Sequence, residues 1–219
     1  MSYSIIIPVY NEVQTLSLLL NHLEPLSIEN EIIFVDDGSD DGSNQLLEKY
    51  KFIKLIKLGK NYGKGAAIKN GIKVSNNKKI LLIDSDLEID PKQIKKLMIL
   101  DSYAPKHSII GTRYKNYNFK ASFLLEFGNF FFTGLFNLIN KTSISDALCC
   151  AKAFNKTSLD TNKLESNGFD IDIELLLQLV KHGETLIEIP LQYSRRGITE
   201  GKKLRIRDGW LILKRLLKN

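Results

Sequence analysis

The sequence predicts an α/β protein with a mostly parallel central sheet and helices on both of its faces. Over the first 115 residues, short apolar runs rich in Ile and Val alternate with segments whose apolar residues recur at helical spacing. Short links between them call for right-handed crossovers, which place the strands in parallel. We expect strands at 4–9, 31–35, 52–58, 79–83 and 108–111, and helices at 16–23, 44–50, 66–74 and from 91 to about 100.

The second half of the chain is less regular. An aromatic helix pattern covers 119–139, a clear helix covers 171–181, an extended segment covers 186–193, and a basic amphipathic helix covers 208–218. The sequence contains no internal repeat and no linker-like stretch. We therefore predict one domain, 1–219, with an N-terminal half at 1–115 and a C-terminal half at 116–219.

The net charge, the cysteines and the apolar stretches limit the classes of ligand and the cellular compartment that suit this protein. A net charge of +6 suits phosphate-bearing ligands or an anionic membrane surface, and no nucleic-acid recognition motif accompanies it. The two cysteines, Cys149 and Cys150, are adjacent, which favours a reducing compartment over a disulfide framework. No uncharged apolar stretch reaches about 18 residues, and the start lacks a basic signal-peptide region. We expect a cytoplasmic protein without a transmembrane helix.

Polar sequences follow three of the expected strands, where open α/β sheets bind ligands. The sharpest is Asp84-Ser85-Asp86: its two carboxylates at i and i+2 suit Mg²⁺ or Mn²⁺ bridging a diphosphate. The alternative is a solvated acidic turn, with Asp90-Pro91 capping the next helix.

Two further turns add weaker signals. Asp36 and Asp37 follow the second strand, and their carboxylates could accept hydrogen bonds from a base N–H or from ribose hydroxyls. The alternative is that the residues of the DGSDDGS stretch simply form a turn and cap the next helix. The stretch NYGKGAA enters a helix through glycines, which permits close backbone approach to an anionic ligand.

Together these motifs resemble family 2 glycosyltransferases, most closely the branch of the dolichyl-phosphate mannose and glucose synthases. The resemblance rests on IIIPVYNE, VDDGSDDGS, NYGKGAAIKNG, DSDL and IIGTRY, and continues through SDALCCAKAF, GFDIDIEL and RGITEGKK. It covers almost the whole chain. It implies the nucleotide-diphospho-sugar transferase fold of the GT-A type, with a nucleotide-sugar-binding half followed by an acceptor-binding half.

The resemblance also implies roles for individual residues. The pocket for a UDP- or GDP-sugar would comprise Pro8, Tyr10, Asn11, Glu12, Asp36, Asp37, Lys64, Gly65, Asp84 and Ser85. The metal ligands would be Asp84, Asp86 and Glu88, the last replacing a Gln that is common in the family. Arg113, Arg196 and Lys203 match basic residues that meet phosphates, although a solvated C-terminal surface is the alternative for the basic cluster.

The implied reaction is metal-dependent transfer of a hexose to a lipid or lipid phosphate, with inversion at the anomeric carbon. A phosphate acceptor needs no strong base, whereas a hydroxyl acceptor needs one, for which Asp146, Asp170 and Asp172 are the candidates. Asp146 and Lys152 keep the family pattern, but their neighbours do not, and Glu126 stands in the region where mannose synthases commonly carry an Arg.

Those departures leave open a soluble glycan or small-molecule acceptor. A nucleotidyltransferase or an inactive nucleotide-binding module is the alternative from another class. The sequence disfavours it, because the chain starts with IPVYNE and not with a Gly-rich loop carrying Arg and Lys.

The two amphipathic segments predict peripheral contact with an anionic membrane, at its cytoplasmic face. The first, 119–139, is dense in Phe; the final helix places Trp210, Leu213 and Leu217 near Lys214, Arg215 and Lys218. The alternative is that both helices simply pack on the sheet.

Overall fold

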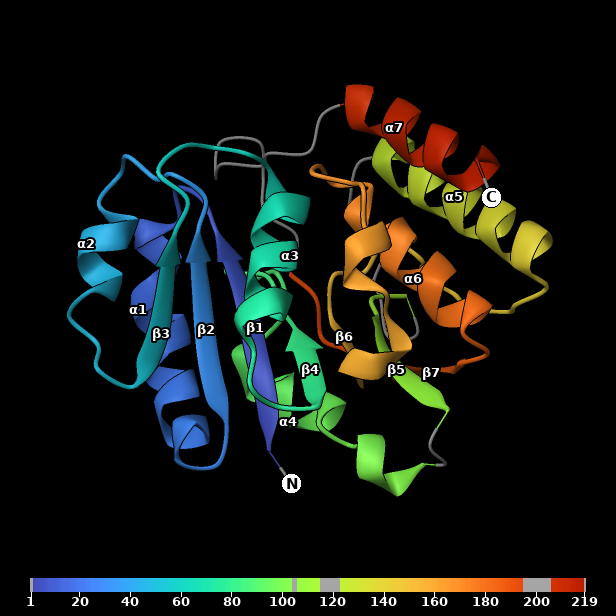
Figure 1. The fold of residues 1–219 in the computed structure, drawn as a ribbon. Coiled ribbons are helices and arrows are strands. Elements are labelled where there is room, and N and C mark those ends of the chain that lie inside the picture. The colour runs from blue at the N-terminus through green and yellow to red at the C-terminus, as the bar shows by residue number, and fades with distance from the viewer. Residues whose placement is uncertain (1, 104–105, 115–122, 195–205, 219) are drawn as a thin grey trace.

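The computed structural model describes residues 2–103, 106–114, 123–194 and 206–218, with backbone alone for 123–126 and 206–207. Its centre is a seven-stranded sheet in the order β3-β2-β1-β4-β6-β5-β7 (Figure 1). The first four strands are parallel, as predicted: β1 (Tyr3–Val9), β2 (Glu31–Asp36), β3 (Ile53–Lys57) and β4 (Lys79–Leu82).

The other three strands extend the sheet beyond β4. They are β5 (His107–Thr112), β6 (Lys152–Asn155) and β7 (Thr185–Pro190). β6 runs antiparallel to both β4 and β5, and β7 pairs in parallel with β5. We did not predict β6, because a four-residue KAFN segment that begins with Lys lacks the apolar run of a buried strand, yet Lys152 is fully buried.

Helices cover both faces of the sheet, as predicted. They are α1 (Val13–Leu23), α2 (Ser43–Leu47), α3 (Lys64–Val74), α4 (Ile94–Leu97), α5 (Phe123–Asn140), α6 (Ile171–Lys181) and α7 (Ile206–Leu217). The single helix expected from 91 to about 100 is wrong. A 3₁₀ turn at Pro91–Gln93, the one-turn α4 and a second 3₁₀ turn at Leu100–Ser102 replace it, because Met98 (ψ 46°) leaves helical geometry.

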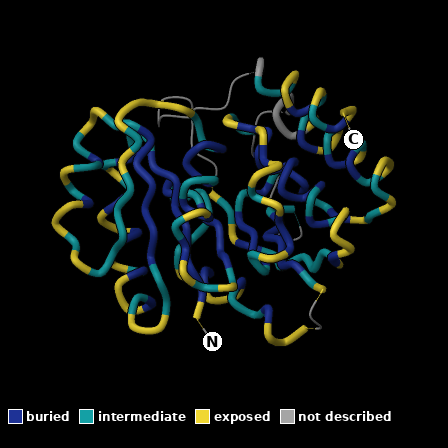
Figure 2. The backbone as a smooth tube through the Cα atoms, viewed as in Figure 1, coloured by how far each residue is buried: buried dark blue, intermediate teal, exposed yellow. Residues whose placement is uncertain are grey.

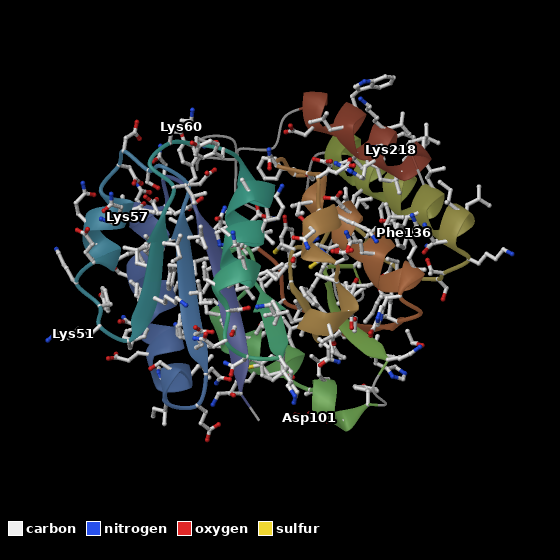
Figure 3. The ribbon with its side chains drawn as sticks, in the orientation of Figure 1. Lys51, Lys57, Lys60, Asp101, Phe136 and Lys218 are labelled. Carbon is white, nitrogen blue, oxygen red and sulfur yellow. The ribbon has the colours of Figure 1, made fainter. Side chains whose placement is uncertain are left out.

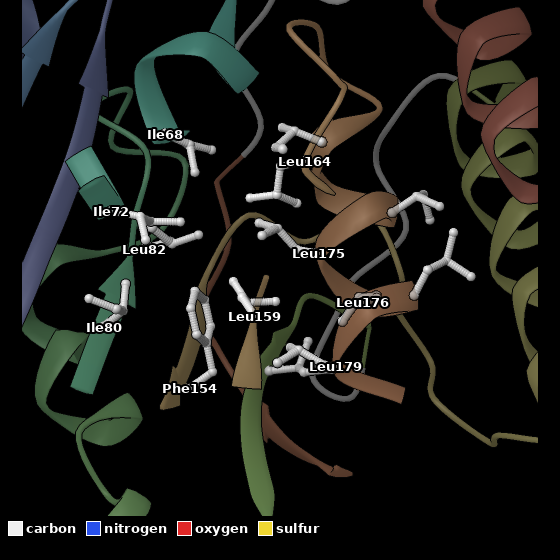
Figure 4. Close-up of a cluster of buried hydrophobic side chains, with 14 of the residues drawn as sticks. Ile68, Ile72, Ile80, Leu82, Phe154, Leu159, Leu164, Leu175, Leu176 and Leu179 are labelled. Carbon is white, nitrogen blue, oxygen red and sulfur yellow. The ribbon is translucent and has the colours of Figure 1, made fainter. Parts of the chain in front are cut away.

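Alternation along β1 divides the core into two layers. Ile6 packs in one layer with α3 and α6, and Ile5 and Ile7 pack in the other with α1 and α4. Figure 2 shows the buried residues concentrated in the strands, and Figure 4 shows the first layer, a buried cluster that includes Ile72, Leu82 and Leu175. Burying one such side chain contributes about 1.5–3 kcal/mol.

Helices α5 and α7 lie side by side at one edge of the molecule (Figure 1). Phe136 of α5 and Ile212 and Leu216 of α7 are buried, so both helices do pack against the domain. Large apolar side chains nevertheless remain exposed on them: Phe127, Phe130, Phe131, Leu138, Ile139, Trp210, Leu211 and Leu217. Within the ranges described, no helix combines the length and apolarity needed to span a membrane.

Candidate active site

The candidate site lies at the carboxyl ends of β1, β2 and β4, which meet at one edge of the parallel sheet. Lys60 marks this end of the molecule and Asp101 the opposite end (Figure 3). The loops that follow these strands contain six of the sequence-predicted donor residues: Tyr10, Asn11, Glu12, Asp37, Asp84 and Ser85. Pro8 and Asp36 lie near the ends of β1 and β2, and Lys64 and Gly65 begin α3.

The loops after β1 and β2 brace each other. Asn11, in the left-handed conformation (φ 51°), donates its backbone N–H to Ser39 Oγ at 2.9 Å. Its side chain donates to Asp40 at 2.8 Å and accepts from the Asp40 N–H at 2.9 Å. Glu12 donates its N–H to Ser43 Oγ at 2.9 Å. Hydrogen bonds to Ser39 and Asp40 thus hold Asn11 in the left-handed conformation. This indicates a loop of fixed shape beside the edge of the sheet where ligands bind.

Ser85 ties the third loop to the first. Its hydroxyl donates to the Pro8 carbonyl at 3.0 Å, and its own carbonyl accepts from Thr15 Oγ1 at 2.8 Å. Ser85 is 4% exposed, and these two bonds hold the backbone between Asp84 and Asp86 against the first loop.

Asp37 shapes the glycine turn that follows β3. Its two carboxylate oxygens accept the N–H groups of Tyr62 and Gly63, each at 2.8 Å. Burial raises the pKa of Asp37, against the opposing effect of those two N–H donors. Asp36 is equally buried and accepts from the Ser39 N–H at 3.2 Å. Both acids therefore serve first to build the loops that we predicted would bind a base or ribose.

The turn at Gly63 to Gly65 packs directly against the backbone of residues 166–168. A Cβ on Gly63 (φ 102°) would lie 2.2 Å from the Asn167 carbonyl oxygen, and one on Gly65 2.5 Å from the Ser166 carbonyl oxygen. The Gly65 N–H donates to the Asn167 carbonyl at 2.9 Å. Only glycine permits this contact between the N-terminus of α3 and the segment before α6.

We expect Gly63→Ala to lower the free energy of unfolding by about 2 kcal/mol or more, because backbone must move to accept the methyl group. Gly59→Ala is the matched control: Gly59 also has positive φ (74°), but nothing lies within 4 Å of its Cβ position. Urea unfolding of both variants measures the difference, and equal losses would contradict the packing described.

Lys64 joins the Asp84 loop to α6. Its ammonium lies 3.0 Å from Asp84 Oδ2 and 3.1 Å from Asp172 Oδ2, and Lys152 Nζ lies 2.9 Å from Asp172 Oδ1. Burial opposes the charge on Lys64, but the carboxylates of Asp172 and Asp84 outweigh it and hold its pKa well above the ordinary value. The network fixes the Lys64 ammonium at the ligand edge of the sheet, paired there with two carboxylates.

Two carboxylates of the acidic motif, Asp86 and Glu88, accept hydrogen bonds from within the protein. Asp86 Oδ1 accepts the Glu88 N–H at 3.0 Å, whereas the Glu88 side chain accepts from the Tyr193 hydroxyl at 2.6 Å. Across the described part of the chain, no three or more His, Cys, Asp and Glu side chains are grouped to hold a metal ion. The predicted third ligand, Glu88, is thus turned toward Tyr193.

Asp84 and Asp86 nevertheless fit one kind of metal site. Mg²⁺ is commonly held by one or two carboxylates together with substrate phosphates and water, without a complete protein cage. Asp84 Oδ2 already pairs with the ammonium of Lys64, so a metal ion bound here would share this carboxylate with Lys64.

Arg113 forms a second cationic centre, after β5. Its Nε and Nη2 each donate to Asp146 at 2.7 Å, and its guanidinium lies 5.8 Å and 5.3 Å from the ring centroids of Tyr114 and Tyr193. Asp146 is fully buried and also accepts from Asn129 Nδ2 at 3.2 Å. Burial opposes the charge, but Asp146 keeps the pKa of Arg113 well above its ordinary value.

The three aspartates predicted as general bases are all engaged by cations. Asp146 pairs with Arg113, Asp170 lies 3.1 Å from Arg215, and Asp172 lies between Lys64 and Lys152. Burial would raise the pKa of Asp172, but the two lysines lower it to about 2. A general base works best with a pKa near the operating pH, so this value makes Asp172 a poor one.

Arg196 and Lys203 lie outside the described residues, and their contact with phosphates stays a prediction. Conversely, sequence reasoning missed Tyr193 and Arg215 as parts of the site's framework. A tyrosine in an extended segment and an arginine in a basic helix carry no local sign of their partners.

Comparison with known proteins places these features in a family. The family model described as glycosyl transferase family 2 matches residues 4–162. Undecaprenyl-phosphate 4-deoxy-4-formamido-L-arabinose transferase of Aeromonas hydrophila is 33% identical over 123 residues, which cover 52% of this chain and 37% of that protein. The Proteus mirabilis enzyme of the same name is 29% identical over 166 residues, covering 72% and 50%. The chain thus spans about half or less of the length of these relatives.

Solved structures show the same fold. Glucosyl-3-phosphoglycerate synthase from Mycobacterium tuberculosis in complex with UDP superposes with a TM-score of 0.75 at 15% identity, covering 99% of this chain and 79% of that one. The complex of that enzyme with Mn²⁺, UDP-glucose and phosphoglyceric acid gives a TM-score of 0.74. The predicted GT-A fold is confirmed. Because the family model covers well over half of the residues, the chain belongs to glycosyl transferase family 2.

Proposed function

We propose that the protein is a metal-dependent, inverting glycosyltransferase that moves a hexose from a UDP-sugar to a lipid phosphate at a membrane surface. The observation that carries this proposal is the Lys64–Asp84 pair beside Asp86 at the carboxyl end of β4. It places one fixed cation and two carboxylates where this fold binds ligands. The UDP complexes of the structural neighbours support UDP over GDP.

The donor diphosphate would lie across this edge of the sheet. Asp84 and Asp86 would hold Mg²⁺ or Mn²⁺, which when bound supplies positive charge that stabilises the departing UDP. Lys64 would donate a charged hydrogen bond to a phosphate oxygen, with Asp172 keeping it protonated and in place. The rigid loops of Asn11 and Asp37 would border the nucleoside.

The acceptor is proposed to be a phosphate because the three candidate general bases are already paired with cations. Asp146, Asp170 and Asp172 all pair with cations. A phosphate oxygen is anionic, so it attacks the anomeric carbon from the face opposite UDP without giving up a proton. The names of the relatives, transferases that act with undecaprenyl phosphate, support the same class of acceptor.

A screen of donors tests the proposal. We expect the purified protein to hydrolyse UDP-sugars slowly with Mn²⁺ or Mg²⁺, to lose this activity with EDTA, and to turn over faster when lipid extract is added. Release of pyrophosphate from a nucleoside triphosphate and a sugar phosphate would favour the nucleotidyltransferase alternative. Absence of any nucleotide turnover would favour an inactive binding module.

Peripheral contact with the membrane is proposed to occur through α5 and α7. Phe127 is 60% exposed, Trp210 71% and Leu217 65%, on two helices that lie side by side. Lys214 adds an exposed cation, whereas Arg215, which we placed on the basic face, turns inward to the carboxylates of α6. Each cation near an anionic surface is worth about 1 kcal/mol.

We expect the protein to co-sediment with anionic liposomes at low salt, and Trp210→Glu to reduce the bound fraction. Ile28→Glu is the matched control, since Ile28 is even more exposed than Trp210 (85% against 71%) but lies in the 3₁₀ turn after α1, away from α5 and α7. If wild-type protein stays in solution, the lipid acceptor is wrong and the soluble-acceptor alternative replaces it.

A further inference from the structure

We infer that Arg215 of α7 is a positioning residue for the donor site. Its guanidinium pairs with carboxylates of α6 and of the segment before it, whereas the Lys64–Asp84 pair lies on other elements. Arg215 holds the segment 165–168 against the turn that carries Lys64. Because Arg215 belongs to α7, the position of α7 against α6 then influences the affinity for the nucleoside diphosphate. This inference rests on the proposed function.

Arg215 gathers three carboxylates at the start of α6. Its Nε lies 3.1 Å from Asp170 Oδ2, and its Nη1 lies 2.8 Å from Glu174 Oε1 and 3.1 Å from Glu165 Oε2. Asp170 and Glu174 are 6% and 5% exposed. Like charges so placed repel one another strongly unless a cation lies between them. A planar guanidinium can bond several carboxylates at once, which a single ammonium cannot do in the same geometry.

The same carboxylates fix the backbone of the segment before α6. Glu174 accepts the N–H groups of Glu165 and Ser166 at 2.9 Å and 2.8 Å. Asp170 accepts from the Ser166 hydroxyl at 2.5 Å. Any rearrangement of Glu174 and Asp170 that follows loss of Arg215 therefore moves residues 165 and 166.

That segment in turn fixes the donor turn. The Asn167 carbonyl accepts from the Gly65 N–H at 2.9 Å, and Asn167 Oδ1 accepts from Lys69 Nζ at 2.8 Å. Because no side chain separates the two backbones at Gly63 and Gly65, a shift of the segment is passed directly to Lys64.

A second connection runs along α6 itself. Asp172, which pairs with Lys64, lies in the first turn of α6 between Asp170 and Glu174, which pair with Arg215. The first turn of one helix therefore holds the Lys64 ammonium on one side and α7 on the other.

The experiment measures UDP binding by calorimetry in the presence of Mn²⁺, for wild type, Arg215→Lys, Arg215→Ala and Lys163→Ala. Lys163 is the control: it is 79% exposed, pairs with Asp160 on the surface, and its loss changes net charge by the same amount as Arg215→Ala. We expect the Arg215 variants to bind UDP about 2- to 30-fold more weakly, the range typical of residues that couple to a site without touching its ligand. Lys163→Ala should bind like wild type.

Hydrogen exchange at the Gly65 amide provides a readout that needs no ligand. We expect faster exchange at Gly65 in the Arg215 variants, at temperatures where thermal unfolding shows each variant to be folded. A residue that merely anchors α7 would lower the unfolding temperature and leave both UDP affinity and Gly65 exchange unchanged.

The outcomes separate the two claims. If wild type binds no UDP, the proposed donor is wrong, and Gly65 exchange alone decides the coupling. If wild type binds UDP but Arg215→Lys keeps wild-type affinity and wild-type exchange at Gly65, the inference is overturned. Should Arg215→Ala fail to fold, Arg215→Lys carries the test, because it keeps a cation but not the planar fork.

Discussion

Asp172→Asn is expected to lower the free energy of unfolding by about 3–5 kcal/mol at neutral pH, the cost of removing one partner from a buried ion pair. Lys152, fully buried, and Lys64 would then share the interior without their common carboxylate. Asp160→Asn is the control, since Asp160 pairs with Lys163 at the surface and should matter little. Urea unfolding at pH 7 measures both variants, and equal stabilities would contradict the role assigned to Asp172.

The same group predicts a pH dependence. The pKa of Asp172 is about 2 in the folded protein against an ordinary 3.8. A lowered carboxyl pKa contributes stability that is complete above the unfolded value and is lost as pH falls through the folded value. Wild type should therefore lose about 2 kcal/mol from this group between about pH 4 and pH 2. Asp172→Asn should lack that loss, so the two stability curves should approach each other in acid.

Asp86→Ala is expected to reduce transfer by at least about 100-fold, the scale for losing a charge-stabilising element of a site, and to abolish metal-dependent binding of nucleotide. The fold should survive, because Asp86 is only partly buried and lies in the loop after β4. A sugar-transfer assay and far-UV circular dichroism measure the two properties.

Glu88→Gln is the informative companion to Asp86→Ala. Glu88 accepts a hydrogen bond from Tyr193, and Gln can accept it too. We expect this variant to retain metal-dependent turnover. Loss of metal dependence in Glu88→Gln, with activity intact in Asp86→Ala, would show that the ligand set has been assigned to the wrong carboxylates.

Sequence patterns were sufficient for the N-terminal half of the sheet because its strands are apolar runs with turn residues at their ends. They failed at β6, where Lys152 begins a central strand. From sequence alone, a lysine is assigned to the surface unless a partner for its charge is known. The partner of Lys152 is Asp172, which lies on a different element. The helix expected after Pro91 failed for a local reason, the departure of Met98 from helical geometry.

Only part of the site was predicted, again because some of its residues depend on partners from distant elements. Motifs that follow strands could be assigned to the ligand edge because topology alone brings strand ends together. The pairing of Lys64 with Asp172 joins residues 108 positions apart and has no local signature. Without it, Asp172 resembled a candidate base, whereas the structure makes it the anchor of two lysines.

Transfer to a lipid phosphate is the central claim, and one assay tests it most directly. Protein, Mn²⁺ and radiolabelled UDP-sugars are incubated with undecaprenyl phosphate in detergent, and label is followed into the organic phase. We predict label in the lipid fraction with wild type and none with Asp86→Ala or without Mn²⁺. Label that remains entirely in the aqueous phase, while the protein transfers the same sugar to a soluble acceptor, would contradict the proposal.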